Sequence, residues 1–249
     1  MLYLLLSISL LQPAPPPTPQ DVIALLRGDQ WAEAVDIVRK HPQEYSPNQG
    51  VRDALLFALS RQTDRLKLCA EQYASGHPCP PPENKSEGEY FLDLLQTVIE
   101  WKISGSGPAL LDALYGNAPE DAVAAILSQD TEEARTVFEL IQRRYYSDHP
   151  FDRSNRVAYL RTVAKFLDKK PLRDPSRQST VVGMVLDGLN DWNFMLVEAA
   201  VRASRHFMKH PLVVARVRQI AATDEIGLSH EAKRAVVEAR KVLEEPSVQ

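Results

Sequence analysis

The ten residues LLRGDQWAEA, at positions 25–34, decide the fold expected for this chain. Leu25 and Leu26 belong to an apolar helical face that begins at Val22, and Gly28 follows that face directly. A second apolar face begins at Trp31. Because glycine commonly ends a helix and apolar residues recur on both sides of it at helical spacing, the stretch predicts two short helices. The expected unit is an αα-hairpin near residues 21–41.

The outer ends of this hairpin carry their own signals. Thr18 stands before Pro19 and Asp21, which suits a capping hydroxyl, a proline at the first helical position and a carboxylate at the positive end of the helix dipole. The second helix is expected from Trp31 to Lys40, because Pro42 follows closely.

The same stretch resembles the middle of a tetratricopeptide repeat, in which a glycine, an aromatic residue and a small alanine let two helices pack closely. Gly28, Trp31 and Ala34 supply these residues here, with one extra residue between the glycine and the aromatic side chain. The resemblance implies a helical-repeat hairpin and no catalytic residues.

Helical spacing of apolar residues continues along most of the chain. Only 10 glycines and 7% aromatic residues are present, which argues against a β-rich fold, and strand-like alternation is absent. A capping box at residues 86–89 precedes a further helix. The other expected helices are 51–61, 63–74, 108–115, 119–127, 131–146 and 155–167. The fold class expected is all-α, with stacked helical hairpins forming an α-solenoid or an irregular α-α superhelix.

The C-terminal third contains a repeat. The residues LVEA at 196–199 recur as VVEA at 236–239, an offset of 40 residues, with a helix expected between them at 212–222. The segments 191–202 and 229–243 resemble HEAT-type repeats, whose period is about 40 residues with two helices each. This resemblance implies stacked helix pairs near 180–245. The alternative is an irregular all-α bundle.

Length and composition fit a folded protein with one large domain or two small ones. The 249 residues are 25% charged and 44% hydrophobic, which is ordinary for a globular chain. We expect one helical-repeat domain over residues 18–249.

The N-terminus has the character of an export signal. Residues 1–12 are apolar apart from two serines and Gln12, and a proline-rich run occupies 13–19. A membrane-spanning helix needs about 20 residues, so this segment better fits a secretory signal. Residues 1–17 are therefore expected to be a signal segment with a proline-rich lead, and the protein to be periplasmic or extracellular. No Lys or Arg precedes the run, however, and an apolar helix packed on a cytoplasmic protein is the alternative.

The two cysteines agree with export. Cys69 and Cys79 would close a short loop as a disulfide worth about 2–3 kcal/mol, whereas in the cytosol they would stay as thiols. Only His77 stands nearby as a further ligand, so a disulfide is favoured over a metal site.

Motifs for catalysis are absent, and no catalytic, cofactor-binding or metal-ligating residue is assigned. The chain lacks a phosphate-binding P-loop, a dinucleotide-binding glycine motif, a zinc-protease helix and a nucleophile elbow. His206 and His210 could share a helix face, but Lys209 disfavours a metal and a basic helix C-terminus is the simpler interpretation. Asp187 and Asp191 flank a turn, where Asp191 is expected to cap the next helix.

Charge is distributed unevenly along the chain. Residues 1–142 contain 20 acidic and 10 basic residues, whereas 143–249 contain 13 acidic and 19 basic ones, giving charges of −10 and +6. The densest basic stretch, 143–177, is the expected surface for a partner. A solvated basic face, or attraction between the two halves, is the alternative. The candidate partner-binding residues are Arg153, Arg156, Arg161, Lys165 and Lys169.

The function expected is that of a non-catalytic scaffold for protein–protein interaction, because stacked helical pairs offer an extended concave surface. The expected partner is a protein with an acidic face. Nucleic acid is not expected as a partner, and contact with a membrane is expected only through the N-terminal segment. An enzyme whose site is assembled from distant helices, and a membrane-surface protein held by its N-terminus, are the alternatives.

Overall fold

The chain is all-α, as predicted. A computed structural model describes residues 16–28, 30–78, 87–114 and 119–245, and within these ranges the regular structure is thirteen α-helices and one 3₁₀ turn, without a strand. In this described part no helix combines the length and the apolar character that crossing a membrane requires.

The helices of the first half are mostly short and follow one another closely. Their bounds are α1 Pro19–Arg27, α2 Trp31–Lys40, α3 Pro42–Tyr45, α4 Gln49–Ala74, α5 Glu87–Glu100, α6 Gly107–Asp112 and α7 Glu120–Leu127.

The second half is built of longer helices in a more regular order. It contains α8 Glu132–Tyr145, α9 Pro150–Lys169, α10 Pro175–Leu189, α11 Phe194–Ser204, the 3₁₀ turn η1 Arg205–Phe207, α12 Pro211–Ala221 and α13 His230–Glu244.

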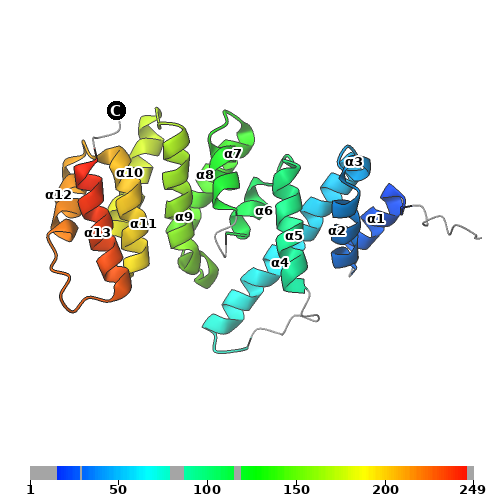
Figure 1. Cartoon of the computed structure of the whole chain (residues 1–249), viewed down its shortest axis with the longest axis horizontal. Helices are drawn as coiled ribbons and strands as arrows, with labels where there is room; N and C mark the ends of the chain where they lie inside the picture. Colours follow the sequence, from blue (N-terminus) through cyan, green and yellow to red (C-terminus); the bar gives the residue numbers. More distant parts are fainter. Residues whose placement is uncertain (1–15, 29, 79–86, 115–118, 246–249) are drawn as a thin grey trace, which may run out of the picture.

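These helices stack in two rows to form an elongated array that runs from α1 to α12 and α13 (Figure 1). In one row α1, α4, α6 and α8 pack each on the next, and α10 and α12 continue it. In the other row α2 packs on α5, and α7, α9, α11 and α13 pack each on the next. A single hairpin cannot bury its apolar stripe alone, so each one is completed by its neighbours along the array.

Buried tyrosines join the layers and use their hydroxyls within the core. Tyr45 donates to the Pro17 carbonyl at 2.6 Å, and Tyr145 of α8 donates to the Met184 carbonyl of α10 at 3.0 Å. Both side chains are fully buried. A buried hydroxyl without a partner would destabilise the fold, so these bonds let large aromatic rings fill the space between helices.

Gly188 marks the closest approach of three helices. A Cβ atom at this position of α10 would lie 2.8 Å from Leu160 Cδ1 on α9 and 2.9 Å from Ala200 Cβ on α11. Only a residue without a side chain lets α9, α10 and α11 come this close.

The predicted hairpin is confirmed at both of its helices. Thr18 Oγ1 accepts from the Asp21 backbone N–H at 3.3 Å, and the Asp21 carboxylate accepts from the Thr18 N–H at 3.0 Å, completing a capping box. α2 begins at Trp31 and ends at Lys40, as predicted, and Trp31 and Ala34 are buried.

Other helix boundaries differ from the predictions. The segments 51–61 and 63–74 form one helix, α4, in which buried Thr63 donates its hydroxyl to the Ser60 carbonyl at 2.9 Å. The Thr63 hydroxyl thereby has a hydrogen-bond partner within the helix, so the threonine does not have to end the helix. The predicted helix 155–167 is longer at both ends, and α10 begins at Pro175, ahead of the helix pairs predicted near 180–245.

Histidine–proline pairs stand at two helix starts, of which the first lies five residues before the predicted start and the second within one residue of it. His149 Nδ1 accepts from the Phe151 N–H at 3.3 Å, so His149 caps α9 and Pro150 occupies its first position. His210 stands at the same place before Pro211 in α12, although its side chain makes no capping hydrogen bond.

The expected cap at Asp191 is wrong. Asn193 caps α11 by accepting from the Met195 N–H at 3.0 Å, whereas Asp191 Oδ1 accepts from the Asn193 N–H at 2.8 Å. Asp191 therefore shapes the turn, and its other oxygen binds Arg156. Three predictions fall partly or wholly outside the described residues: residues 1–15 of the predicted signal segment 1–17, Ser86 of the predicted capping box, and Cys79.

Candidate partner-binding face

The helices α7, α9, α11 and α13 form a continuous face on which buried carboxylates lie beneath cationic side chains; we call it the α9–α13 face. Glu120 begins α7, and its side chain is only 4% exposed. Lys165 of α9 places its Nζ 3.2 Å from Glu120 Oε2 and 2.8 Å from Asp121 Oδ2. Arg161 Nη1 lies one helical turn away, 4.0 Å from Glu120 Oε1. These ion pairs join α7 to α9.

A second buried carboxylate joins α11 to α13. Glu198 lies in the middle of α11 with its side chain 5% exposed. Arg202 of α11 and Arg234 of α13 each place a guanidinium nitrogen 2.7 Å from it. Arg202 Nε also lies 3.4 Å from Glu238 Oε1 on α13. The two glutamates of the 40-residue repeat, Glu198 and Glu238, are thus bridged by one arginine.

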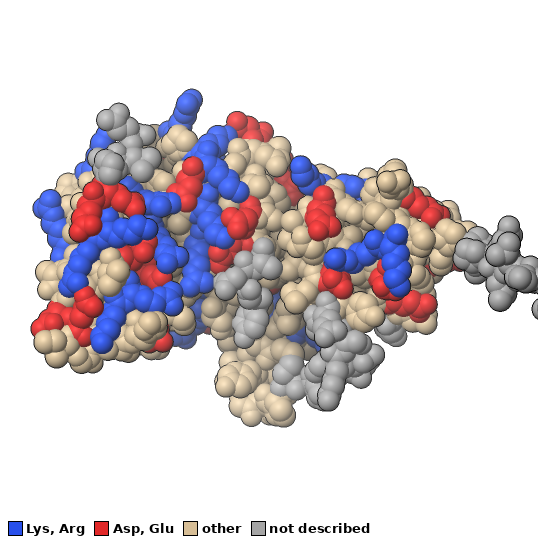
Figure 2. Space-filling view, viewed as in Figure 1, with Lys and Arg blue, Asp and Glu red and all other residues tan. Residues whose placement is uncertain are grey.

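Burial gives this face a more positive surface than its composition suggests. The carboxylate of Glu198 is hidden, while Arg202 and Arg234 remain 47% and 48% exposed. The same holds for Lys165 above Glu120, at 34% against 4%. Lys and Arg side chains gather over α9, α11 and α13 in Figure 2, with acidic atoms between them. Around Glu198 solvent therefore meets the two guanidinium groups first, whereas near Glu120 the exposed Asp121 accompanies Lys165.

The pKa values reflect these contacts. Burial lowers the pKa of Lys165, but its hydrogen bonds to Asp121 and Glu120 outweigh burial and hold the pKa above its ordinary value. The hydrogen bond to Glu198 likewise raises the pKa of Arg234. Lys165 and Arg234 therefore stay protonated throughout the physiological pH range.

The structure places the five candidate partner-binding residues in three different surroundings. Arg161, Lys165 and Lys169 lie on the side of α9 that faces α7, where Lys169 Nζ is 3.3 Å from the Asp121 carbonyl. Arg156 turns toward α10 and pairs with Asp187 and Asp191, with its guanidinium carbon 4.6 Å from the Tyr145 ring centroid. Arg153 is exposed near the start of α9.

Sequence reasoning missed the contribution of α11 and α13 to this face. Arg202, Arg234 and Lys241 lie far from the densest basic stretch, so a count of charge along the chain does not find them. The available signal was the pairing of Glu198 with Arg202 four residues later, within a segment that repeats at an offset of 40 residues.

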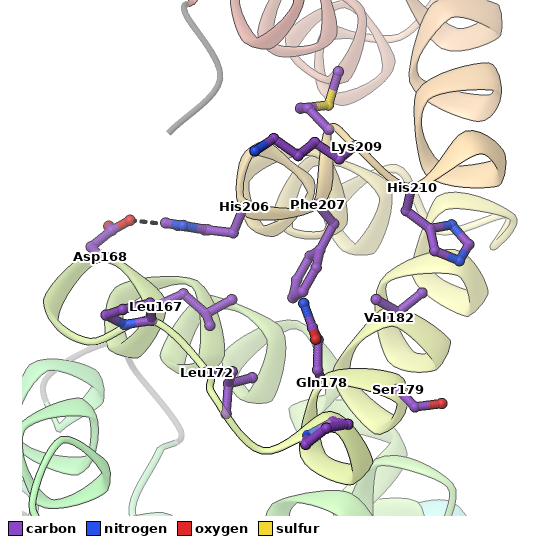
Figure 3. Close-up of a pocket in the computed structure, with 13 residues that line it drawn as sticks. Leu167, Asp168, Leu172, Gln178, Ser179, Val182, His206, Phe207, Lys209 and His210 are labelled. Atoms are coloured by element: carbon purple, nitrogen blue, oxygen red, sulfur yellow. Dashed lines mark hydrogen bonds and ion pairs between the residues drawn. The ribbon is translucent and has the colours of Figure 1, made fainter. Parts of the chain in front are cut away.

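A separate pocket lies at the edge of the array where α9 is joined to α10 and α11 to α12. His206 and His210 both line it, but they do not meet: His206 points to Asp168 at one end, and His210 lies on the side of Val182 and Ser179 (Figure 3). His206 Nε2 is 2.8 Å from Asp168 Oδ1, and Arg205 pairs with the same carboxylate. Burial lowers the pKa of His206 more than Asp168 raises it.

The described residues contain no group of three or more His, Cys, Asp or Glu side chains placed to hold a metal ion. Cys69 lies on α4, and because Cys79 is outside the described residues, the disulfide remains a prediction that an intact-mass measurement would decide.

No family model matches the chain. No curated protein and no solved structure matches it either.

Proposed function

We propose that the chain is a non-catalytic helical-repeat scaffold whose α9–α13 face binds an acidic segment of a partner protein. The observation that carries the proposal is the burial of Glu120 and Glu198 beneath exposed Lys165, Arg202 and Arg234. The cations are held in place across three helices, so they lose little side-chain entropy when a partner arrives. The summed electric field of these cations speeds the encounter with an acidic segment and fixes how that segment is aligned on the face.

Two features support the repeat assignment within this proposal. The α1–α2 hairpin carries the glycine, aromatic and alanine residues of a tetratricopeptide-like unit, with one extra residue between the first two. The α11 and α13 helices pack side by side with equivalent glutamates, as in HEAT-type repeats. The N-terminal segment supports export, which would place the partner in the periplasm or outside the cell.

The test compares two charge reversals of equal size. Lys169→Glu with Lys241→Glu changes the α9–α13 face at side chains that are exposed and not paired with a buried carboxylate. Arg143→Glu with Arg218→Glu is the matched control, because both arginines are exposed on the other row, in α8 and α12. A fluorescent peptide of glutamate and glycine, followed by anisotropy, serves as the acidic probe.

The face variant is expected to bind the acidic peptide about tenfold more weakly, or ~1.4 kcal/mol, while the control binds like the parent protein. Affinity should also fall as salt rises, since the Debye length shrinks from about 10 Å at 0.1 M to about 3 Å at 1 M. If both variants weaken binding equally, the effect comes from the net charge of the protein and not from this face. If the face variant binds the peptide as the parent protein does, the α9–α13 face is not the binding surface.

A further inference from the structure

The pocket at the α9–α10 and α11–α12 connections has the size and lining of a small-molecule site. Its volume is about 700 Å³, within the range of about 300–1,000 Å³ that ligand pockets occupy. It lies between the end of α9 and the start of α10 on one side and the turn η1 with its following residues on the other (Figure 3). The α9–α13 face does not include this pocket, so ligand binding here is independent of the proposed scaffold function.

The floor of the pocket is apolar. Phe207 and Leu167 are buried core residues that also reach its surface, and Leu172 and Val182 are half-buried around them. Pro171, in the α9–α10 connection, and Pro175, the first residue of α10, also line the pocket. Replacing the water above this floor by an apolar group of a ligand makes the binding free energy more favourable.

The polar side chains of the pocket differ in whether they already have partners. Asp168 Oδ1 binds both Arg205 and His206, whereas His210 Nδ1 has no hydrogen-bond partner among the residues described. Lys209, Gln178 and Ser179 are exposed, and in the described part of the chain their side chains make no hydrogen bond or ion pair. An ammonium group, an amide and a hydroxyl are therefore available to a ligand.

The charge around the pocket selects the sign of that ligand. Asp168 is the only acidic side chain among the lining residues described, and Arg205 compensates its charge. Lys209 adds a positive charge without an acidic partner in the described residues. A cationic head group would be repelled by Lys209 and Arg205, whereas an anionic head group would pair with the Lys209 ammonium.

We propose that this pocket binds a small amphipathic carboxylate, with its apolar chain on the floor formed by Leu172, Val182 and Phe207 and its carboxylate on the Lys209 ammonium. Gln178 and Ser179 lie across the pocket from Lys209 (Figure 3), so they donate hydrogen bonds to polar substituents of the chain. The apolar floor supplies affinity, and the single ammonium group supplies the preference for an anion.

The probe is decanoate, titrated by calorimetry into the full chain, with decyltrimethylammonium as a ligand of the same chain length and opposite charge. Ser179→Phe and Gln178→Trp each fill the pocket from an exposed position, and Lys209→Gln removes the ammonium. Lys233→Gln, at an exposed lysine of α13 that does not line the pocket, is the matched control. Melting curves of all variants verify that they fold.

Decanoate is expected to bind the parent protein and the Lys233→Gln variant alike. Affinity should fall several-fold in Lys209→Gln and at least tenfold in whichever filling variant melts like the parent protein. Decyltrimethylammonium should bind much more weakly than decanoate. No decanoate binding at millimolar concentration, equal affinity for the two ligands, or undiminished binding by a folded filling variant would overturn the proposal.

Discussion

The buried carboxylate of Glu198 allows a quantitative test of how α13 is held on α11. Its side chain is 5% exposed and pairs with Arg202 and Arg234, each at 2.7 Å. Replacing both arginines by methionine keeps most of their apolar contact but leaves a buried charge without partners. Breaking a buried pair in this way costs about 3–5 kcal/mol. Because both guanidinium groups are nearly half exposed, water can reach the vacated space, so the lower end, about 3 kcal/mol, is expected.

This loss should be visible in a thermal melt followed by circular dichroism at 222 nm. A change of 1 kcal/mol shifts the melting temperature by about 2–4 °C in a chain of 150–250 residues, so the double variant should melt about 6–12 °C lower. Adding Glu198→Leu removes the orphaned charge and should recover most of the loss, since apolar replacement of a buried ion pair is often neutral.

The control is Lys40→Met, which breaks the exposed pair with Asp36 and should change stability by less than about 1 kcal/mol. The reasoning fails if the double arginine variant melts like the parent protein. It also fails if the triple variant melts as low as the double one, because the cost would then come from lost packing and not from the buried charge.

Two further predictions concern other parts of the array. Gly188→Ala places a Cβ 2.8 Å from Leu160 and 2.9 Å from Ala200, and should lower the unfolding free energy by about 1–3 kcal/mol in urea titrations; Gly183→Ala, whose nearest neighbour is the Tyr146 hydroxyl at 3.4 Å, is the control and should cost much less. Burial lowers the pKa of His206 below its unfolded value, so its contribution to stability is present above pH ~6.5 and is lost as pH falls through the folded pKa. His206→Gln should therefore lose less stability than the parent protein between pH 7.5 and pH 5 in thermal melts, and a steeper loss would contradict this sign.

Much of the fold could be predicted from local patterns. The capping box at Thr18 and Asp21 and the buried Trp31 and Ala34 of the first hairpin depend on residues within a few positions of one another, so the sequence displays them directly. The start of α8 after Thr131 and of α13 after Ser229 follow the same rule, because each cap accepts from a backbone N–H three residues later. The 40-residue offset between the two VEA segments likewise indicated that α11 and α13 are equivalent elements.

Features that depend on packing could not be predicted in this way. Thr63 lies inside one long helix because its buried environment favours a helix where local propensity suggested a break. The bounds of α10 were not predicted either, because its stripe of small and branched residues has meaning only against α9 and α11, which approach it closely at Gly188.

For the candidate site, the sequence by itself determined that the C-terminal half is basic and that α9 carries cations at helical spacing. Only the tertiary structure decided which of them act together. Arg156 turns toward Asp187 and Asp191 on α10 and the following turn. Arg161, Lys165 and Lys169 lie beside α7. Arg202 and Arg234 join this face from α11 and α13, which follow later in the chain. The physical reason is that a net charge is a sum over the sequence, whereas the charge that solvent meets depends on which carboxylates are buried beneath their partners.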